Sequence, residues 1–290
     1  MLELVAFLCG AAVMVLEMAG ARLLAPHLGT SIVVWTGLIG VILASLSAGY
    51  WLGGRLADKN PRPGVLGGII FAAACIVALV GFLHGVLLEA IAGTGMRLHA
   101  ASVLAACVLF CPPGVLLGMV SPYVIRVKIA LNRVDAARSG ALIGRFFALS
   151  TIGSILGTFL GGYVLISVLG TRLILFSVSG ALLISALLVL CLTQERKKTS
   201  RKRGAIIACG VLFCAACAAG SLQLEQQALA RGLVAVDTRY NHIQIVEQGR
   251  GEAAWRYMIT DPGKFQSAVR LGDPDTLAAN YTRFFALTGL

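Results

Sequence analysis

Long apolar runs alternate with short polar segments over the first 223 residues of the chain. The runs are each bounded by charge, proline or glycine, and they cover about 4–24, 31–53, 65–92, 101–125, 142–167, 172–193 and 204–222. A helix needs about 20 apolar residues to cross a bilayer. Residues 1–223 are therefore predicted to form an α-helical polytopic membrane bundle of about seven transmembrane helices.

The pattern changes at residue 224. Residues 234–248, VAVDTRYNHIQIVEQ, alternate between apolar and polar positions, as a half-buried strand does. Residues 251–269 predict a second and a third strand, separated by the turn signal Asp261-Pro262-Gly263. Residues 276–287 predict a helix with Asp275 or Thr276 as its N-cap. We therefore expect residues 224–290 to form a small β-rich domain with one helix.

Composition and charge agree with this division. Hydrophobic residues make up 58% of the 290 residues and charged residues only 13%, about half of the roughly 25% usual in soluble domains. The formal net charge of +11 lies entirely within residues 1–223, and residues 224–290 are neutral. The positive charge therefore indicates a membrane topology, and it gives no reason to expect nucleic acid as a partner.

The basic residues lie in alternate loops of the predicted bundle. The loops after the second, fourth and sixth spans contain almost all of them, and the intervening loops contain only Arg97 and Arg172. Because Lys and Arg are retained on the cytoplasmic side, we expect a multi-pass protein of the cell membrane with a cytoplasmic N-terminus. Seven crossings then place the C-terminal domain outside.

All eight cysteines lie in apolar stretches, including the Cys214–Cys217 pair, whose spacing is also found in zinc and redox sites. No His or acidic residue lies beside this pair. We interpret this pair as small buried side chains of a helix and expect no metal site.

Two ionisable residues lie within the first predicted span. Glu17 is near its middle, and Arg22 follows five residues later. Charges at membrane depth are costly and often functional. The two residues are candidates for a polar site that faces a cavity, or alternatively for an ion pair or hydrogen-bonded anchor inside the bundle. His84 and Glu89, which are nearer a membrane face, are expected to extend toward water.

Glycine and proline give two further predictions about packing. Gly153, Gly157 and Gly161 repeat at four-residue spacing, which predicts close approach of a neighbouring helix. Pro112-Pro113 and Pro122 are expected to interrupt and kink the fourth span.

A resemblance to a known family extends over about 200 residues. Residues 53–63, GGRLADKNPRP, resemble the loop after the second helix of major facilitator transporters. The stretches LEMAGARLLAPHLGTSIVVWTG, GYWLGGRLADKNP, LGMVSPYVIR and ALSTIGSILGTFLGGYVLISVLGTR resemble, in this order, the membrane portion of the fused facilitator-like/spermidine-synthase family. RYNHIQIVEQ and WRYMITDPGKFQSAV resemble the N-terminal β-hairpin domain of polyamine aminopropyltransferases.

This resemblance implies an amine and nucleoside site bordered by Gln266 and Tyr281. The Tyr-His pair usual in the family is Tyr281-Thr282 here. Only 15 residues follow Asp275, too few for the strand, glycine-rich turn and helix of a Rossmann unit. We therefore assign no catalytic residue and no cofactor to this chain, and we expect it to be catalytically incomplete by itself. Decarboxylated S-adenosylmethionine is implied only if another chain supplies a Rossmann domain.

Three functions remain open at this point. The chain is the membrane and hairpin portion of a spermidine-synthase-like protein, a small-molecule transporter of facilitator-like type, or a membrane assembly module whose C-terminal domain docks a protein. The partners to consider are the lipid bilayer, a separate Rossmann-domain chain and a second copy of this chain.

Overall fold

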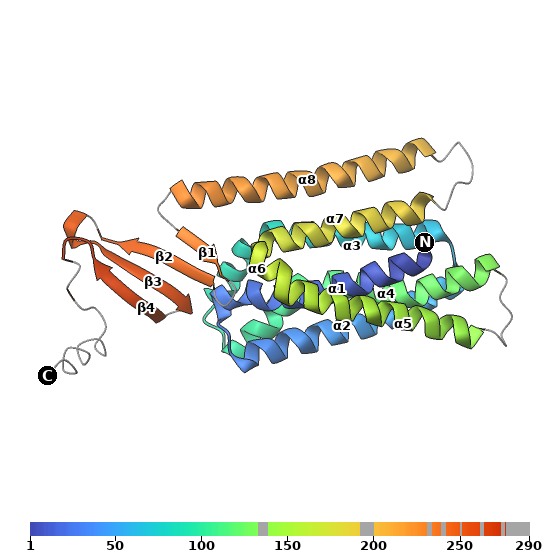
Figure 1. The fold of residues 1–290 in the computed structure, drawn as a ribbon, viewed down its shortest axis with the longest axis horizontal. Coiled ribbons are helices and arrows are strands. Elements are labelled where there is room, and N and C mark those ends of the chain that lie inside the picture. The colour runs from blue at the N-terminus through green and yellow to red at the C-terminus, as the bar shows by residue number, and fades with distance from the viewer. Residues whose placement is uncertain are drawn as a thin grey trace.

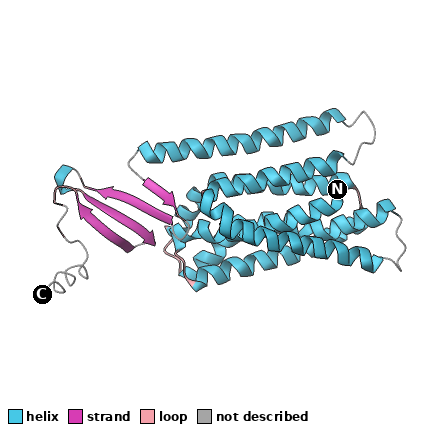
Figure 2. Cartoon of the chain, in the orientation of Figure 1, coloured by secondary structure: helices cyan, strands magenta, loops and turns pink. Residues whose placement is uncertain are grey.

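A computed structural model shows a bundle of long helices followed by a small sheet (Figures 1 and 2). The structure describes residues 1–132, 139–191, 200–230, 234–238, 242–249, 251–261, 264–273 and 276. Seven helical segments of this part are long and apolar enough to cross a membrane. The predicted fold class, a helical membrane bundle with a small β-rich C-terminal domain, is confirmed.

The helices follow the predicted spans closely. Their bounds are α1 Leu2–Leu28, α2 Ile32–Lys59, α3 Pro63–Ala92, α4 Leu98–Asn132, α5 Ser139–Phe159, α6 Ile166–Val168, α7 Thr171–Cys191 and α8 Ser200–Ala230. A six-residue π-helix, η2 (Leu160–Leu165), joins α5 to α6, and these three elements form one span. Helix α8 continues to Ala230, beyond the domain boundary predicted at residue 223.

Helix α1 packs against helices on several sides of the bundle. It contacts α5 and α7 most extensively, and it also contacts α2, α3 and α4. Helix α8 is placed differently, because it packs mainly along α3 and has fewer contacts with α7. Cys214 and Cys217 are buried on α8 beside Ala78 of α3, which confirms that they serve as small buried side chains.

Glycines bring α1 and α5 into close contact, as the four-residue spacing predicts. A β-carbon placed on Gly153 would lie 2.9 Å from the carbonyl carbon of Phe7, and one on Gly157 would lie 2.7 Å from Cα of Ala11. Only glycine permits such a separation without movement of a backbone. At Gly161 the same contact is looser, with Val15 at 3.5 Å.

Helices α2 and α4 form the most extensive pair in the bundle. Near the C-terminal end of α2, a β-carbon on Gly53 would lie 2.6 Å from Cα of Met119, so the two backbones touch. The buried Tyr123 donates its hydroxyl hydrogen to the carbonyl of Asn60, just after α2. Arg126 and Asp58 form an exposed ion pair at the same end.

Helix α4 is continuous through Pro112, Pro113 and Pro122. The prediction that these prolines interrupt the span is wrong. Each proline removes one backbone N–H donor, but neighbouring helices and local adjustment of the turn let membrane helices accommodate proline. Here α2 and α3 both pack on α4 and support it.

The C-terminal domain contains a four-stranded antiparallel sheet in the order β1-β2-β3-β4. The strands are β1 Val234–Asp237, β2 His242–Gln248, β3 Trp255–Asp261 and β4 Lys264–Arg270. Residues 234–248 therefore form two paired strands, and the prediction of one strand there is wrong. Asp261 and Lys264, which flank the predicted turn, pair with each other, and Pro262 and Gly263 lie outside the described residues. The predicted helix 276–287 lies outside the described residues, except for Thr276.

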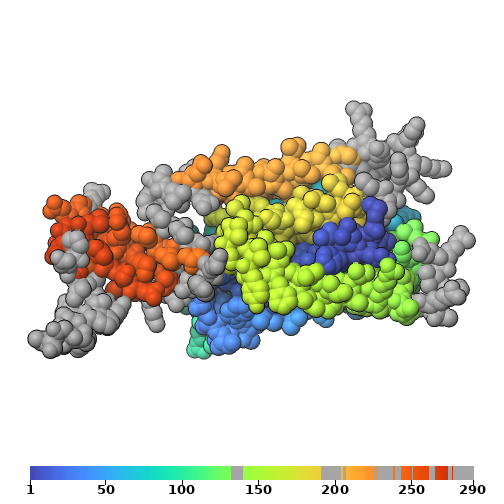
Figure 3. Space-filling view, viewed as in Figure 1, coloured from blue at the N-terminus to red at the C-terminus, as the bar shows by residue number. Residues whose placement is uncertain are grey.

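The sheet lies beyond the end of the bundle that is opposite the N-terminus (Figures 1 and 3). Both β2 and β3 contact α1, and α8 leads toward β1. The odd number of long apolar helices explains this arrangement, because seven crossings end on the face opposite the starting face.

Candidate functional site in the first helix and the adjoining sheet

Glu17 lies in the middle of α1 and is half-buried. Within the described part of the chain, no side chain forms an ion pair or a hydrogen bond with its carboxylate. An acidic side chain at this depth is costly unless it is neutral, hydrated or bound to a cation. This position is therefore the strongest chemical candidate inside the bundle.

The packing of its neighbours shows which way Glu17 faces. Gly20, almost one turn further along, lies against Phe110 of α4 and Leu38 of α2. Val15 and Met18 lie on the side of α1 that faces Gly161 of η2. At about 100° per residue, Glu17 falls between the face of α1 that packs on α4 and α2 and the face that packs on η2.

The π-helix η2 lies beside α1 at the same level as Glu17. Leu160–Leu165 is a full π-helical segment, and its Gly161 is 3.5 Å from Val15 when a β-carbon is added. π-helices are rare, and single turns of this kind often occur at functional sites because they displace backbone carbonyls from the regular pattern. Nothing in the sequence signals this feature except the Gly161-Gly162 pair.

Arg22 does not form a salt bridge with Glu17. Its Nη1 atom donates a hydrogen bond to the carbonyl oxygen of Thr238, at 3.2 Å, just after β1. Five helical residues place the two side chains about 140° apart around α1, which explains why they do not meet. This bond joins the bundle to the sheet, a role that differs from both of those considered for the pair from the sequence.

Gln266 lies on β4, and its Oε1 atom accepts a hydrogen bond of 2.9 Å from the hydroxyl of Thr260 on β3. The sheet thus fixes the amide of Gln266 at an exposed position. Tyr281, the other residue of the expected amine site, lies outside the described residues. The Thr260 contact could not be found from the sequence, because it depends on the irregular register between β3 and β4.

A second polar group, the imidazole of His84, lies inside the bundle toward the end that carries the sheet. His84 is buried, and its Nδ1 atom lies 3.0 Å from the carbonyl oxygen of Gly81 on its own helix. The expectation that His84 extends toward water is therefore wrong, whereas Glu89 is exposed. Arg172 bridges α7 and α8 through the carbonyl of Ser221, at 3.2 Å. The Arg172 bond joins α7 to α8, whereas the His84 bond lies within α3.

No three His, Cys, Asp or Glu side chains in the described ranges gather closely enough to hold a metal ion. Comparison with protein-family models, with curated proteins and with solved structures finds no match for this chain.

Proposed function

We propose that this chain is the membrane and β-hairpin portion of a spermidine-synthase-like protein, in which the sheet borders a polyamine site. The single observation that carries the proposal is the position of Gln266. It lies directly after the β3–β4 turn, and Thr260 holds its amide in a fixed orientation. The order of sequence stretches that resemble this family supports the same assignment.

The attachment of the sheet to the bundle agrees with such a role. Arg22 bonds to the chain just after β1, and α1 also contacts β2 and β3. A sheet held in this way presents Gln266 at a defined position relative to the membrane. The chemistry of aminopropyl transfer would then require a nucleotide-binding unit beside β4, since no general base with a defined partner is found near Gln266 among the described residues.

Purification of the protein from its native membrane, together with any bound protein, tests this proposal. The complex should transfer an aminopropyl group from decarboxylated S-adenosylmethionine to putrescine. Gln266→Leu should lower kcat/KM by about tenfold, as loss of a ~1.4 kcal/mol contact does. The matched control is Gln248→Leu, an exposed glutamine of β2, which should leave the rate unchanged. Equal rates in both variants, or no transfer by a complex that binds the nucleoside, would contradict the proposal.

The orientation of the protein is also part of the proposal. The positions of the basic loops support a cytoplasmic N-terminus, and the sheet would then lie outside the cell. The protein belongs on this basis to the plasma membrane, and the polyamine that it meets is extracellular or periplasmic.

A second candidate function, transport of a small cation, is favoured by Glu17. Its carboxylate has no partner in the described part of the chain, and a π-helix lies beside it within the membrane. A cationic amine that crosses the bundle would pair with such a group.

Uptake of labelled putrescine into proteoliposomes separates the two functions. Transport requires Glu17→Gln to abolish uptake while Glu89→Gln, at the exposed end of α3, does not. Unchanged uptake in Glu17→Gln would eliminate a transport role for this residue.

A further inference from the structure

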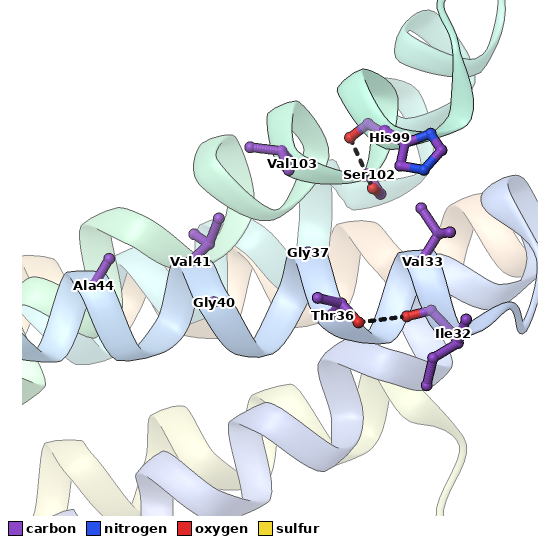
Figure 4. A pocket seen from close by; sticks show the side chains of 10 residues that line it. All are labelled: Ile32, Val33, Thr36, Gly37, Gly40, Val41, Ala44, His99, Ser102 and Val103. Atoms are coloured by element: carbon purple, nitrogen blue, oxygen red, sulfur yellow. Dashed lines mark hydrogen bonds between the residues drawn. The ribbon is translucent and has the colours of Figure 1, made fainter.

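A groove lies between α2 and α4 at the end of the bundle that carries the sheet. Its volume is about 560 Å³ and its walls are almost entirely apolar (Figure 4). The residues that line it are Ile32, Val33, Thr36, Gly37, Gly40, Val41, Ala44, His99, Ser102 and Val103. We propose that this groove binds one acyl chain of an anionic phospholipid, whose phosphate lies at the N-terminal ends of α2 and α4.

The dimensions of the groove fit an acyl chain. It extends along α2 from Ile32 to Ala44, twelve residues further on, which is about 18 Å at ~1.5 Å per residue. One leaflet of a bilayer contributes about 15 Å of hydrocarbon, half of the ~30 Å core. The groove therefore reaches from the membrane surface to about the middle of the bilayer, as one lipid tail does.

The interior of the groove offers little to a polar ligand. The hydroxyl of Thr36 donates to the carbonyl of Ile32 at 2.8 Å, and that of Ser102 donates to the carbonyl of His99 at 3.0 Å. Both hydroxyls therefore satisfy their hydrogen bonds within their own helices, as Figure 4 shows. An apolar chain leaves these bonds intact, whereas a polar solute would have to compete with them.

The mouth of the groove is positively charged. The 28-residue α2 begins at Ile32 and the 35-residue α4 begins at Leu98, so both helices direct their N-termini to this end. Helix N-termini carry partial positive charge and unpaired N–H groups that attract phosphate. Arg97 immediately precedes α4, and His99 lies at the mouth itself (Figure 4).

The charged groups at the mouth indicate the charge of the lipid headgroup that would bind there. Arg97 and His99 are both exposed, so a headgroup can reach them. Glu89, an exposed acidic residue toward this end, lies on the last turn of α3, before the connection to α4. Arg97 and the N-termini of α2 and α4 favour a headgroup with net negative charge over a zwitterionic one. This inference does not rest on the proposed polyamine function.

Gly40 gives a direct way to fill the groove. A β-carbon at Gly40 meets no atom within 4 Å, so a larger side chain would occupy the groove without displacing the protein. Gly54, on the same helix and outside the groove, also has open space around it and provides a matched control. Ala44→Leu fills the deep end of the groove and serves as a second blocking variant.

Native mass spectrometry tests the proposal. The protein is released from nanodiscs that contain equal amounts of phosphatidylglycerol and phosphatidylcholine with the same acyl chains. The wild type and Gly54→Leu should each retain one phosphatidylglycerol molecule. Gly40→Leu and Ala44→Leu should retain at least about tenfold less, equivalent to ~1.4 kcal/mol. Elution as a single species at the wild-type volume establishes that each variant is folded.

The headgroup is tested separately with Arg97→Gln combined with His99→Gln. This double variant should lose the preference for phosphatidylglycerol over phosphatidylcholine while it still retains one lipid. An unchanged preference would overturn the assignment of the phosphate to the mouth. Equal retention of lipid by Gly40→Leu and Gly54→Leu would overturn the acyl-chain site.

Discussion

The two halves of the α2–α4 pair are built differently. Toward the cytoplasmic end that we propose, Gly53 brings the helix backbones into contact, and Tyr123 and Arg126 bind the end of α2. Toward the sheet, open space lies beside Gly40, although Gly37 still lies close to Ser102 of α4. Glycine is used in both halves, but in the closed half it permits backbone contact and in the open half it forms part of the groove wall.

This difference shows how two membrane helices can pack stably against each other and still leave a groove between them. Helices in lipid associate through close packing and polar contacts, since the hydrophobic effect does not separate protein from lipid tails. Glycine contacts along the pair can hold the helices together while a groove beside Gly40 accommodates lipid. Substitutions in the closed half, in the open half and in the similar α1–α5 contact should therefore differ in their effect on stability.

The largest effect is expected at Gly53. Its β-carbon would lie 2.6 Å from Cα of Met119, and a backbone atom can yield only if the helices separate. Gly53→Leu should lower the free energy of unfolding by about 3 kcal/mol, measured by detergent titration in mixed micelles. Gly54→Leu, whose β-carbon meets no atom within 4 Å, should change it by less than about 0.5 kcal/mol. Similar losses in both variants would remove the distinction between contact glycines and open glycines.

A somewhat smaller effect is expected for the α1–α5 contact. Gly153→Ala brings a β-carbon within 2.9 Å of the carbonyl carbon of Phe7 and should destabilise the protein by about 2 kcal/mol. Gly144→Ala, on the same helix with open space around it, should be neutral or stabilise by up to about 1 kcal/mol. Equal stability of Gly153→Ala and Gly144→Ala would show that the α1–α5 contact does not require glycine at residue 153.

Tyr123→Phe should cost about 1 kcal/mol of unfolding free energy, because it removes the hydrogen bond to the carbonyl of Asn60 while keeping the buried ring. The same micelle titration measures this loss. Tyr163→Phe is the control, since Tyr163 is 75% exposed on η2. A neutral Tyr123→Phe would show that the closed half does not depend on this bond.

The smallest effect is expected at the exposed Arg126–Asp58 pair. Both side chains are about half exposed, at 49% and 59%. Asp58→Asn should change the free energy of unfolding by less than about 0.5 kcal/mol, because water and salt screen such pairs. A loss above about 1 kcal/mol would mean that charge, rather than glycine contact, holds the closed half together.

The sequence predicts the helices well because a bilayer imposes a simple requirement. Any run of about 20 apolar residues becomes a span, and α1 to α8 follow the predicted runs. The interruption expected in α4 at Pro112, Pro113 and Pro122 is wrong, because the effect of a proline depends on the support that neighbouring helices give to α4. The sequence does not predict the break between β1 and β2, because a polar stretch such as residues 237–242 is usual both between strands and within an exposed strand.

The candidate sites are predictable only in part. The sequence identifies Glu17 and Arg22 because they are charged residues within an apolar run. Their contacts could not be predicted, because these depend on how α1 is rotated in the bundle. Gly40 and Gly53 are both glycines of the same apolar helix, and the sequence does not distinguish them. Their different surroundings follow from the arrangement of α2 and α4. Gln266 follows from its resemblance to a family motif, whereas its contact with Thr260 requires the sheet.

Accessibility of two engineered cysteines tests the central claim, that an odd number of crossings separates the N-terminal face from the sheet. Ser267→Cys lies on the exposed face of β4, and Lys59→Cys lies at the exposed end of α2. In intact cells, a membrane-impermeant maleimide should label Ser267→Cys and should label Lys59→Cys only after permeabilisation. The wild-type chain controls for the native cysteines. Labelling of both variants from the same side would contradict the seven-span topology, and labelling of Lys59→Cys alone would contradict the proposed orientation.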